Sequence, residues 1–150
     1  MKSLLSVVLL ALLCAGCQTT ARDTRPVNSD DVNRNITLPR NLPNVWYRPD
    51  VGPAGQSPPI VNGTIMVGTD AILYNGEEGT TLNIPTRAIR SVVWRVMKSD
   101  LVNQWAVVIW LQDGAEQLVG FCAADGYRYD TSNKELYSAI VMAWQGQQKR

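Results

Sequence analysis

Histidine is absent from the sequence, and neither sign of charge is in excess. The absence of histidine excludes Ser-His-Asp and Cys-His nucleophilic sites, histidine-ligated zinc and acid–base catalysis by imidazole. Lys and Arg number 14 and Asp and Glu number 13, so the chain lacks the strongly basic surface of a nucleic-acid-binding domain. No segment has the ligand spacing of an EF-hand or a zinc site, or the glycine-rich loop that holds a phosphate. We therefore expect no enzymatic activity, no metal or other cofactor and no nucleic-acid partner.

The first 17 of the 150 residues have the pattern of a cleaved leader. Lys2 precedes a stretch of apolar and small residues from Leu4 to Leu13, which ends at Cys14-Ala15-Gly16-Cys17. This stretch is shorter than the roughly 20 residues that a transmembrane helix needs. The pattern predicts a signal peptide over residues 1–16.

The small residues Ala15 and Gly16 stand directly before Cys17, and this ending resembles the lipobox of bacterial lipoproteins. The resemblance implies that Cys17 becomes the first residue and carries a diacylglycerol thioether and an N-acyl chain. Several acyl chains hold a protein permanently at a membrane, because each buried methylene contributes about 0.8 kcal/mol. In that family an Asp after the Cys signals retention in the inner membrane, so Gln18 implies an outer-membrane protein that faces the periplasm. The alternative is a plain secreted protein that is cleaved after another small residue.

Residues 17–59 are rich in proline and have no sustained apolar period. They hold seven of the eight prolines, at positions 26, 39, 43, 49, 53, 58 and 59. A chain of this composition is extended and builds no core, so we expect the lipidated Cys17 and a flexible tether to occupy this region. Within it, segment 42–49 is locally apolar and aromatic. Its Trp46 and Tyr47 either pack back onto the folded domain or dock a partner.

From residue 60 to residue 150 the pattern changes to that of one small domain. Short apolar stretches separated by turn signals predict antiparallel β-strands. Asp113-Gly114 is the strongest hairpin signal, because glycine tolerates the positive φ of a tight turn. In segment 103–111 apolar residues occupy both faces, so we expect both faces of that strand to be covered. Cys122 lies in an apolar run and is expected to be buried and inert.

The final segment has the period of a helix. Ser132 and Glu135 fit a capping box, and apolar residues at spacings of three and four follow over 136–144. An amphipathic helix must pack its apolar stripe on another element. Six or seven strands followed by one such helix predict a mainly β fold, a small antiparallel barrel whose open end is closed by the C-terminal helix.

Two stretches of this domain are similar to bacterial pleckstrin-homology-like (PH-like, GRAM-like) domains. They are the opening Gly63-x-x-x-Val67-x-x-x-x-Ile72-Leu73-Tyr74 and the segment Ile84–Val92. With the order of the strands and the closing helix, the resemblance covers residues 60–146. It implies a small antiparallel barrel, or split sheets, capped by the helix. Its motifs are patterns of apolar spacing without invariant catalytic residues, so the resemblance implies a fold rather than an activity.

The most concentrated positive charge of the domain lies at Arg87, Arg90, Arg95 and Lys98. In a regular strand Arg90 and Lys98 share one face, Arg95 points to the opposite face, and Arg87 lies before the strand. We name Arg87, Arg90 and Lys98 as candidate contacts for anionic lipid. The alternative is a solvated strand face.

Aromatic residues supply the candidate contacts for a partner. Trp105 and Trp110 are five residues apart and face opposite sides of a regular strand, so at least one lies outside the barrel unless something covers it. An exposed Trp on a β surface is a typical anchor of an interface. Trp46, Tyr47, Trp105 and Trp110 are therefore candidate partner contacts.

These observations predict a non-enzymatic interaction or scaffolding module, attached to the membrane by its lipid, which binds an envelope protein or peptide at the periplasmic face. The edges of such a sheet can accept an extended segment by main-chain pairing. The alternative is binding or sensing of a small amphiphile, a lipid or a glycan fragment, in the barrel mouth under the helix. A carrier needs a cavity between the helix and the open end, whereas a scaffold needs an exposed apolar patch.

Overall fold

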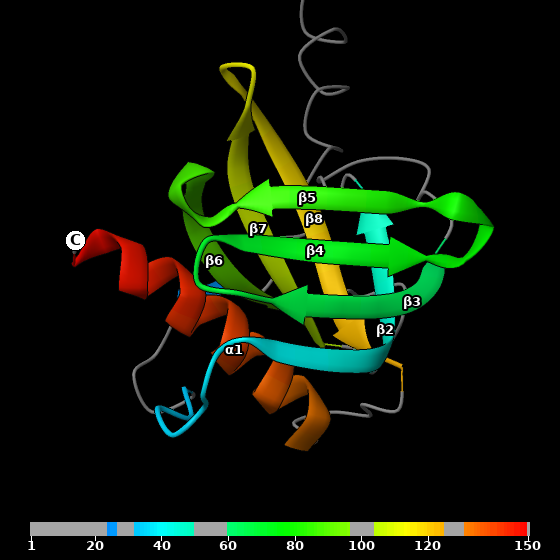
Figure 1. Ribbon diagram of the computed structural model, residues 1–150, viewed down its shortest axis with the longest axis horizontal. Helices are drawn as coiled ribbons and strands as arrows, with labels where there is room; N and C mark the ends of the chain where they lie inside the picture. The colour runs from blue at the N-terminus through cyan, green and yellow to red at the C-terminus, as the bar shows by residue number, and fades with distance from the viewer. Residues whose placement is uncertain (1–23, 27–31, 50–59, 97–103, 125–130, 150) are drawn as a thin grey trace, which may run out of the picture.

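The computed structural model describes residues 24–26, 32–49, 60–96, 104–124 and 131–149, and it is mainly β with one C-terminal helix, as the sequence predicts (Figure 1). The strands and helices in chain order are β1 (Thr24–Pro26), β2 (Arg40–Pro49), β3 (Val61–Val67), β4 (Ala71–Gly76), the 3-10 helix η2 (Glu77–Gly79), β5 (Thr81–Pro85), the 3-10 helix η3 (Thr86–Ala88), β6 (Ile89–Val96), β7 (Gln104–Gln112), β8 (Ala115–Ala123) and α1 (Thr131–Gln148). Among the residues that the structure describes, no helix combines the length and apolarity needed to cross a membrane.

All the strands belong to one antiparallel sheet with the order β1-β6-β7-β8-β2-β3-β4-β5. The sheet ends at β1 and β5, so it is open and does not close into a barrel, which was one of the two expected forms. Figure 1 shows β3, β4 and β5 lying across β6, β7 and β8, with α1 along one end. Inward residues of both halves, such as Ile72 and Val108, belong to one buried core cluster. The sheet therefore curls around a single core.

The position of β2 corrects the expected boundary between tether and domain. Residues 40–49 were predicted to belong to the tether, but β2 lies in the centre of the sheet between β8 and β3. Its Val45 pairs with Ala123 on one side and with Gly63 on the other. The register shifts between Leu42 and Val45, and this irregularity contains Pro43, so the proline does not interrupt the regular ladder. The folded part thus includes β2, while residues 1–23, 27–31 and 50–59 of the predicted leader and tether lie outside the described residues.

Aromatic rings fill the centre of the core. The ring of Tyr74 lies 5.1 Å from that of Tyr47 and 5.9 Å from that of Phe121, measured between centroids. The Tyr74 hydroxyl lies 3.0 Å from the carbonyl oxygen of Val45 and 2.9 Å from that of Val61, and it donates its one hydrogen to either. This hydroxyl joins β2, β3 and β4 at one point and so satisfies a buried polar group.

Helix α1 packs against β6, β7 and β8 and covers the core at one end. The side chains of Leu136, Ala139 and Ile140 are buried there, as the predicted stripe requires. Near the start of the helix the Asn133 side-chain oxygen accepts a 2.7 Å hydrogen bond from the Ala123 amide of β8. Near the end the Gln147 side-chain amide donates to the Thr69 carbonyl at 2.8 Å. Both ends of the helix are thus tied to the sheet by polar contacts.

We expect the free energy of unfolding to fall as the pH rises from about 10 to about 12. Burial, and then the nearby charges of Glu77 and Tyr47, raise the pKa of Tyr74 to about 12. Because the folded-state pKa lies above the unfolded value, the contribution of Tyr74 to stability is complete below the unfolded pKa and is lost as the pH passes through the folded one. A two-unit shift corresponds to about 2.7 kcal/mol at most.

Urea unfolding at several pH values between about 9 and 12 measures this decline. Tyr74→Phe should be less stable at neutral pH by about 1 kcal/mol, because it loses a buried hydrogen bond, and its stability should depend less on alkaline pH. The stability of the variant will still depend to some extent on alkaline pH, since burial also raises the pKa of Tyr47. If the variant and the parent decline in parallel, Tyr74 is not the group responsible.

Candidate functional site

The structure buries three of the four predicted aromatic contacts. Tyr47 is 9% exposed, Trp105 is 0% exposed and Trp110 is 5% exposed, so these three do not form a contact surface as predicted. Trp46 is half-buried and packs against a buried cluster. Of the two interpretations of segment 42–49, the one in which Trp46 and Tyr47 pack onto the domain is the one that the structure shows. The reason is that β2 lies in the centre of the sheet.

A second apolar cluster explains how Trp105 and Trp110 are both buried on opposite faces of β7. Trp110 points into the core, and Trp105 points outward. We call Trp105, Val107, Cys122 and the half-buried side chains around them the outer cluster. These surrounding side chains are Trp46, Val93, Ile109 and Leu118. The Arg48 guanidinium lies 5.2 Å from the centroid of a Trp105 ring and is itself only 4% exposed. Both apolar faces of β7 are therefore covered, and Cys122 is buried, as the sequence predicts.

Large exposed apolar side chains are few in the described part of the chain. Ile60 is 39% exposed and Met66 is 41% exposed. Met66 pairs across strands with the half-buried Leu73 on the outer face of β3 and β4. Two side chains make a small apolar area, since exposed patches that mark interfaces usually extend over several hundred Å².

The predicted basic contacts lie beside the start of β6. Arg87 is in η3 and Arg90 is the second residue of β6, and both are exposed. Ile89 pairs with Trp110 and Ser91 with Ile109, so Arg90 is an extra residue in a β-bulge. The bulge breaks the regular alternation on which the predicted shared face of Arg90 and Lys98 depended. Lys98 lies outside the described residues.

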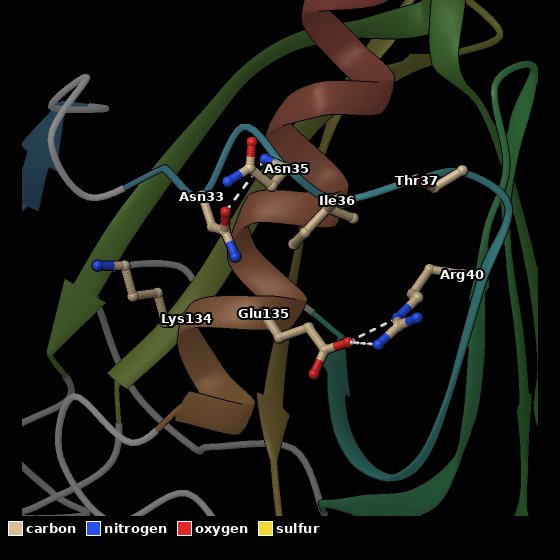
Figure 2. A pocket seen from close by; sticks show the side chains of 7 residues that line it. All are labelled: Asn33, Asn35, Ile36, Thr37, Arg40, Lys134 and Glu135. Carbon is tan, nitrogen blue, oxygen red and sulfur yellow. Dashed lines mark hydrogen bonds and ion pairs between the residues drawn. The ribbon is translucent and has the colours of Figure 1, made fainter.

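An open polar cleft of about 340 Å³ lies between the segment before β2 and the first turns of α1 (Figure 2). It is lined by Asn33, Asn35, Ile36, Thr37, Arg40, Lys134 and Glu135. In Figure 2 the side chains of Arg40 and Glu135 point toward each other, and they form an ion pair that includes a 2.6 Å hydrogen bond from Nε to Oε1. Lys134 points away from this pair. Because two of the charged groups pair with each other, the cleft is a polar contact zone between the segment before β2 and α1.

Sequence reasoning missed this cleft. Arg40 and Glu135 are 95 residues apart, and the segment that carries Arg40 was assigned to the tether. The same segment is fixed to α1 a second time, where the Asn33 amide donates to the Ser138 hydroxyl at 2.9 Å. No local pattern in the sequence marks contacts of this range.

The region under the helix, where an amphiphile would enter, is filled by side chains of the core. Leu136 and Ile140 of α1 are fully buried in the same cluster as Phe121 and Ile65 of the sheet. The polar cleft lies at the outer side of α1, and Ile36 is the one apolar residue among the seven that line it. These described side chains pack against one another at the place where a carrier of a lipid would need an apolar cavity.

The two ends of the sheet differ in what lies on them. Strand β5 has five residues, ends in Pro85 and is flanked by the two 3-10 helices. Strand β6 has eight residues, and β1 pairs with part of its outer edge: Thr24 faces Arg95, Arg25 faces Trp94 and Pro26 faces Val93. A segment that is far from β6 in the sequence has thus joined the sheet as an added strand.

No family model matches the chain, and no curated protein matches it. Within the described ranges, no three Cys, Asp or Glu side chains gather where they could hold a metal ion. The features of the described residues that favour binding are the edge of β6 and the basic residues beside it, Arg87 and Arg90.

Proposed function

We propose that the protein is a non-enzymatic lipoprotein of the cell envelope that binds a protein or peptide at the periplasmic face of the outer membrane. In this proposal Cys17 carries the acyl chains, Gln18 directs the protein to the outer membrane, and the β domain is the binding module. The order of the strands, with α1 packed at one end of the core, supports the resemblance to PH-like domains.

The observation that carries this proposal is the addition of β1 to β6. The backbone N–H and C=O groups of an edge strand are a template for pairing with another extended chain. Main-chain hydrogen bonds then supply affinity, and neighbouring side chains supply specificity. Because a remote segment of the same chain already pairs there, the outer edge of β6 has the twist and accessibility that strand addition needs.

Site-specific photocrosslinking in intact envelopes tests the proposal. A photoreactive amino acid at Arg90, next to the β6 edge, should give a discrete adduct with an envelope protein. The matched control carries the same group at Glu116, an exposed residue in the β7–β8 hairpin on the far side of β7 from β6. Once identified, the captured protein should bind the purified lipoprotein directly. Equal adducts at both positions, or failure of the purified proteins to bind, would count against an interaction module.

A further inference from the structure

The strand that occupies the β6 edge is a weak occupant. Strand β1 has three residues, and one of them, Pro26, has no N–H to donate. In an antiparallel pair only alternate residues exchange both hydrogen bonds, so β1 and β6 share at most about three. A longer extended segment with a backbone N–H at every residue would pair with more of the β6 edge than β1 does.

Strand β6 itself is held firmly from the other side. From Ser91 to Val96 it pairs continuously with β7. Its Val92 is buried in the core, and the ring of Trp94 lies 4.5 Å from that of Tyr137 on α1, edge to face. An edge that is fixed in this way loses little conformational entropy when a strand is added, which favours binding.

Positive charge stands at one end of this edge. Arg87 and Arg90 are exposed, and the ion pair that the structure shows among the described residues joins two other groups, Arg40 and Glu135. The β-bulge at Arg90 is of the kind that redirects a side chain at a sheet edge. The two guanidinium groups are thus available to a carboxylate of an incoming chain.

The register gives the direction in which an incoming chain runs. Thr24 faces Arg95 and Pro26 faces Val93, so β1 runs toward the start of β6. A segment that continues in this direction passes Val92 and Ser91 and then reaches Arg90 and Arg87. The carboxylates that reach these arginines must therefore lie C-terminal, in the incoming segment, to the residues that pair with β6.

We infer that the outer edge of β6 binds an extended segment of a partner protein that displaces β1 and places acidic residues, C-terminal to its paired residues, on Arg87 and Arg90. The inference rests on the proposed function and specifies the partner's chemistry. Strand β1 acts as a tethered competitor that keeps the edge from pairing with unrelated chains. The partner must therefore supply both backbone pairing and negative charge.

Peptide binding to the full mature chain tests this inference. The probe is a fluorescently labelled peptide with the sequence of residues 22–31, which contains the β1 sequence followed by Asp30 and Asp31. The receptor is the Thr24→Pro/Arg25→Pro variant, in which no β1 residue can donate a backbone hydrogen bond. A tethered strand has a millimolar effective concentration, so we expect the peptide to bind this variant at least about tenfold more tightly than the parent.

Three controls separate pairing from charge. A peptide N-methylated at Thr24 and Arg25 keeps its charges but cannot donate, and it should bind at least about fivefold more weakly. A peptide with Asn at positions 30 and 31, or a receptor that also carries Arg87→Ala and Arg90→Ala, should lose affinity by a similar factor. Amide hydrogen exchange should slow at residues 91–96 when the unmodified peptide is bound.

Three results would overturn the inference. Equal binding of the methylated peptide would show charge attraction without strand addition, and no binding to either protein would show that the edge takes no such segment. Phosphatidylglycerol vesicles that bind through Arg87 and Arg90, without peptide binding, would assign these residues to a membrane surface instead. Any of these results leaves the photocrosslinking at Arg90 as a separate test of the proposed function.

Discussion

Gly63→Ala is expected to destabilise the fold by at least about 3 kcal/mol. A Cβ atom at this position would lie 2.3 Å from the carbonyl oxygen of Asn75 and 2.6 Å from the Cα of Gly76. Both are backbone atoms of β4, the strand that pairs with β3, so neither can move without separating the two strands. The same Cβ would lie 2.7 Å from the Tyr74 hydroxyl and would disturb its hydrogen bonds to Val45 and Val61. The cost of overpacking is therefore added to the loss of a buried hydrogen bond.

Gly146→Ala is the matched control for this substitution. Gly146 lies within α1, and an added Cβ there has no neighbouring atom within 4 Å. Alanine in place of glycine in a helix should stabilise the protein by about 0.5 to 1 kcal/mol. Urea unfolding, followed by circular dichroism, compares the two variants with the parent. A Gly63→Ala protein that unfolds within about 0.5 kcal/mol of the parent would show that β3 and β4 can separate at little cost.

Local patterns were sufficient for the second half of the domain. The predicted Asp113-Gly114 turn is present between β7 and β8, with φ of 51° and 81° at the two residues. The alternation in segment 103–111 correctly indicated a strand that is covered on both faces, and the apolar stripe over 136–144 correctly indicated a helix. These predictions succeeded because hairpins and amphipathic helices depend on residues that are close together in the sequence.

The first half of the domain depends on distant contacts, and there local reasoning was wrong. Segment 40–49 has a proline within it and another at its end, which locally favours a tether. It becomes a strand because β3 and β8 offer partners on both sides and because the bulge accommodates Pro43. The burial of Trp105 follows from the same placement, since Arg48 and Trp46 of β2 both belong to its surroundings. One missed strand thus explains both the wrong boundary and the burial of Tyr47 and Trp105, which were predicted to contact a partner.

The candidate site was predictable in part. Arg87 and Arg90 were correctly expected to be exposed, because charged residues near a strand end rarely find a buried partner. The edge that they flank could not be predicted, since its occupant β1 comes from the region that the composition assigned to a tether. A bulge at Arg90 also has no signal in the local sequence, because it is defined by the register of β6 against β7.

Cys17→Ser is expected to release the protein from the membrane completely. The lipobox-like residues imply three acyl chains on Cys17, and a single chain already gives an association constant of about 10⁴ M⁻¹. Since each further methylene adds about 0.8 kcal/mol, the parent should remain entirely in the membrane fraction, and the variant should be soluble in the periplasm. Fractionation followed by immunoblotting measures the distribution, and intact mass measures the lipid.

Two further variants separate lipidation from other effects of the substitution. Cys122→Ala removes the buried thiol of the domain and should leave the membrane fraction unchanged, so the loss of a cysteine alone does not release the protein. Gln18→Asp keeps the anchor and should move the protein from the outer to the inner membrane.

A Cys17→Ser protein that stays in the membrane would refute the lipid anchor. The β6 edge would then no longer be limited to partners near the outer membrane. If the anchor is confirmed, it keeps the β6 edge near the outer membrane, so the local concentration of a partner there is as important as the partner's affinity.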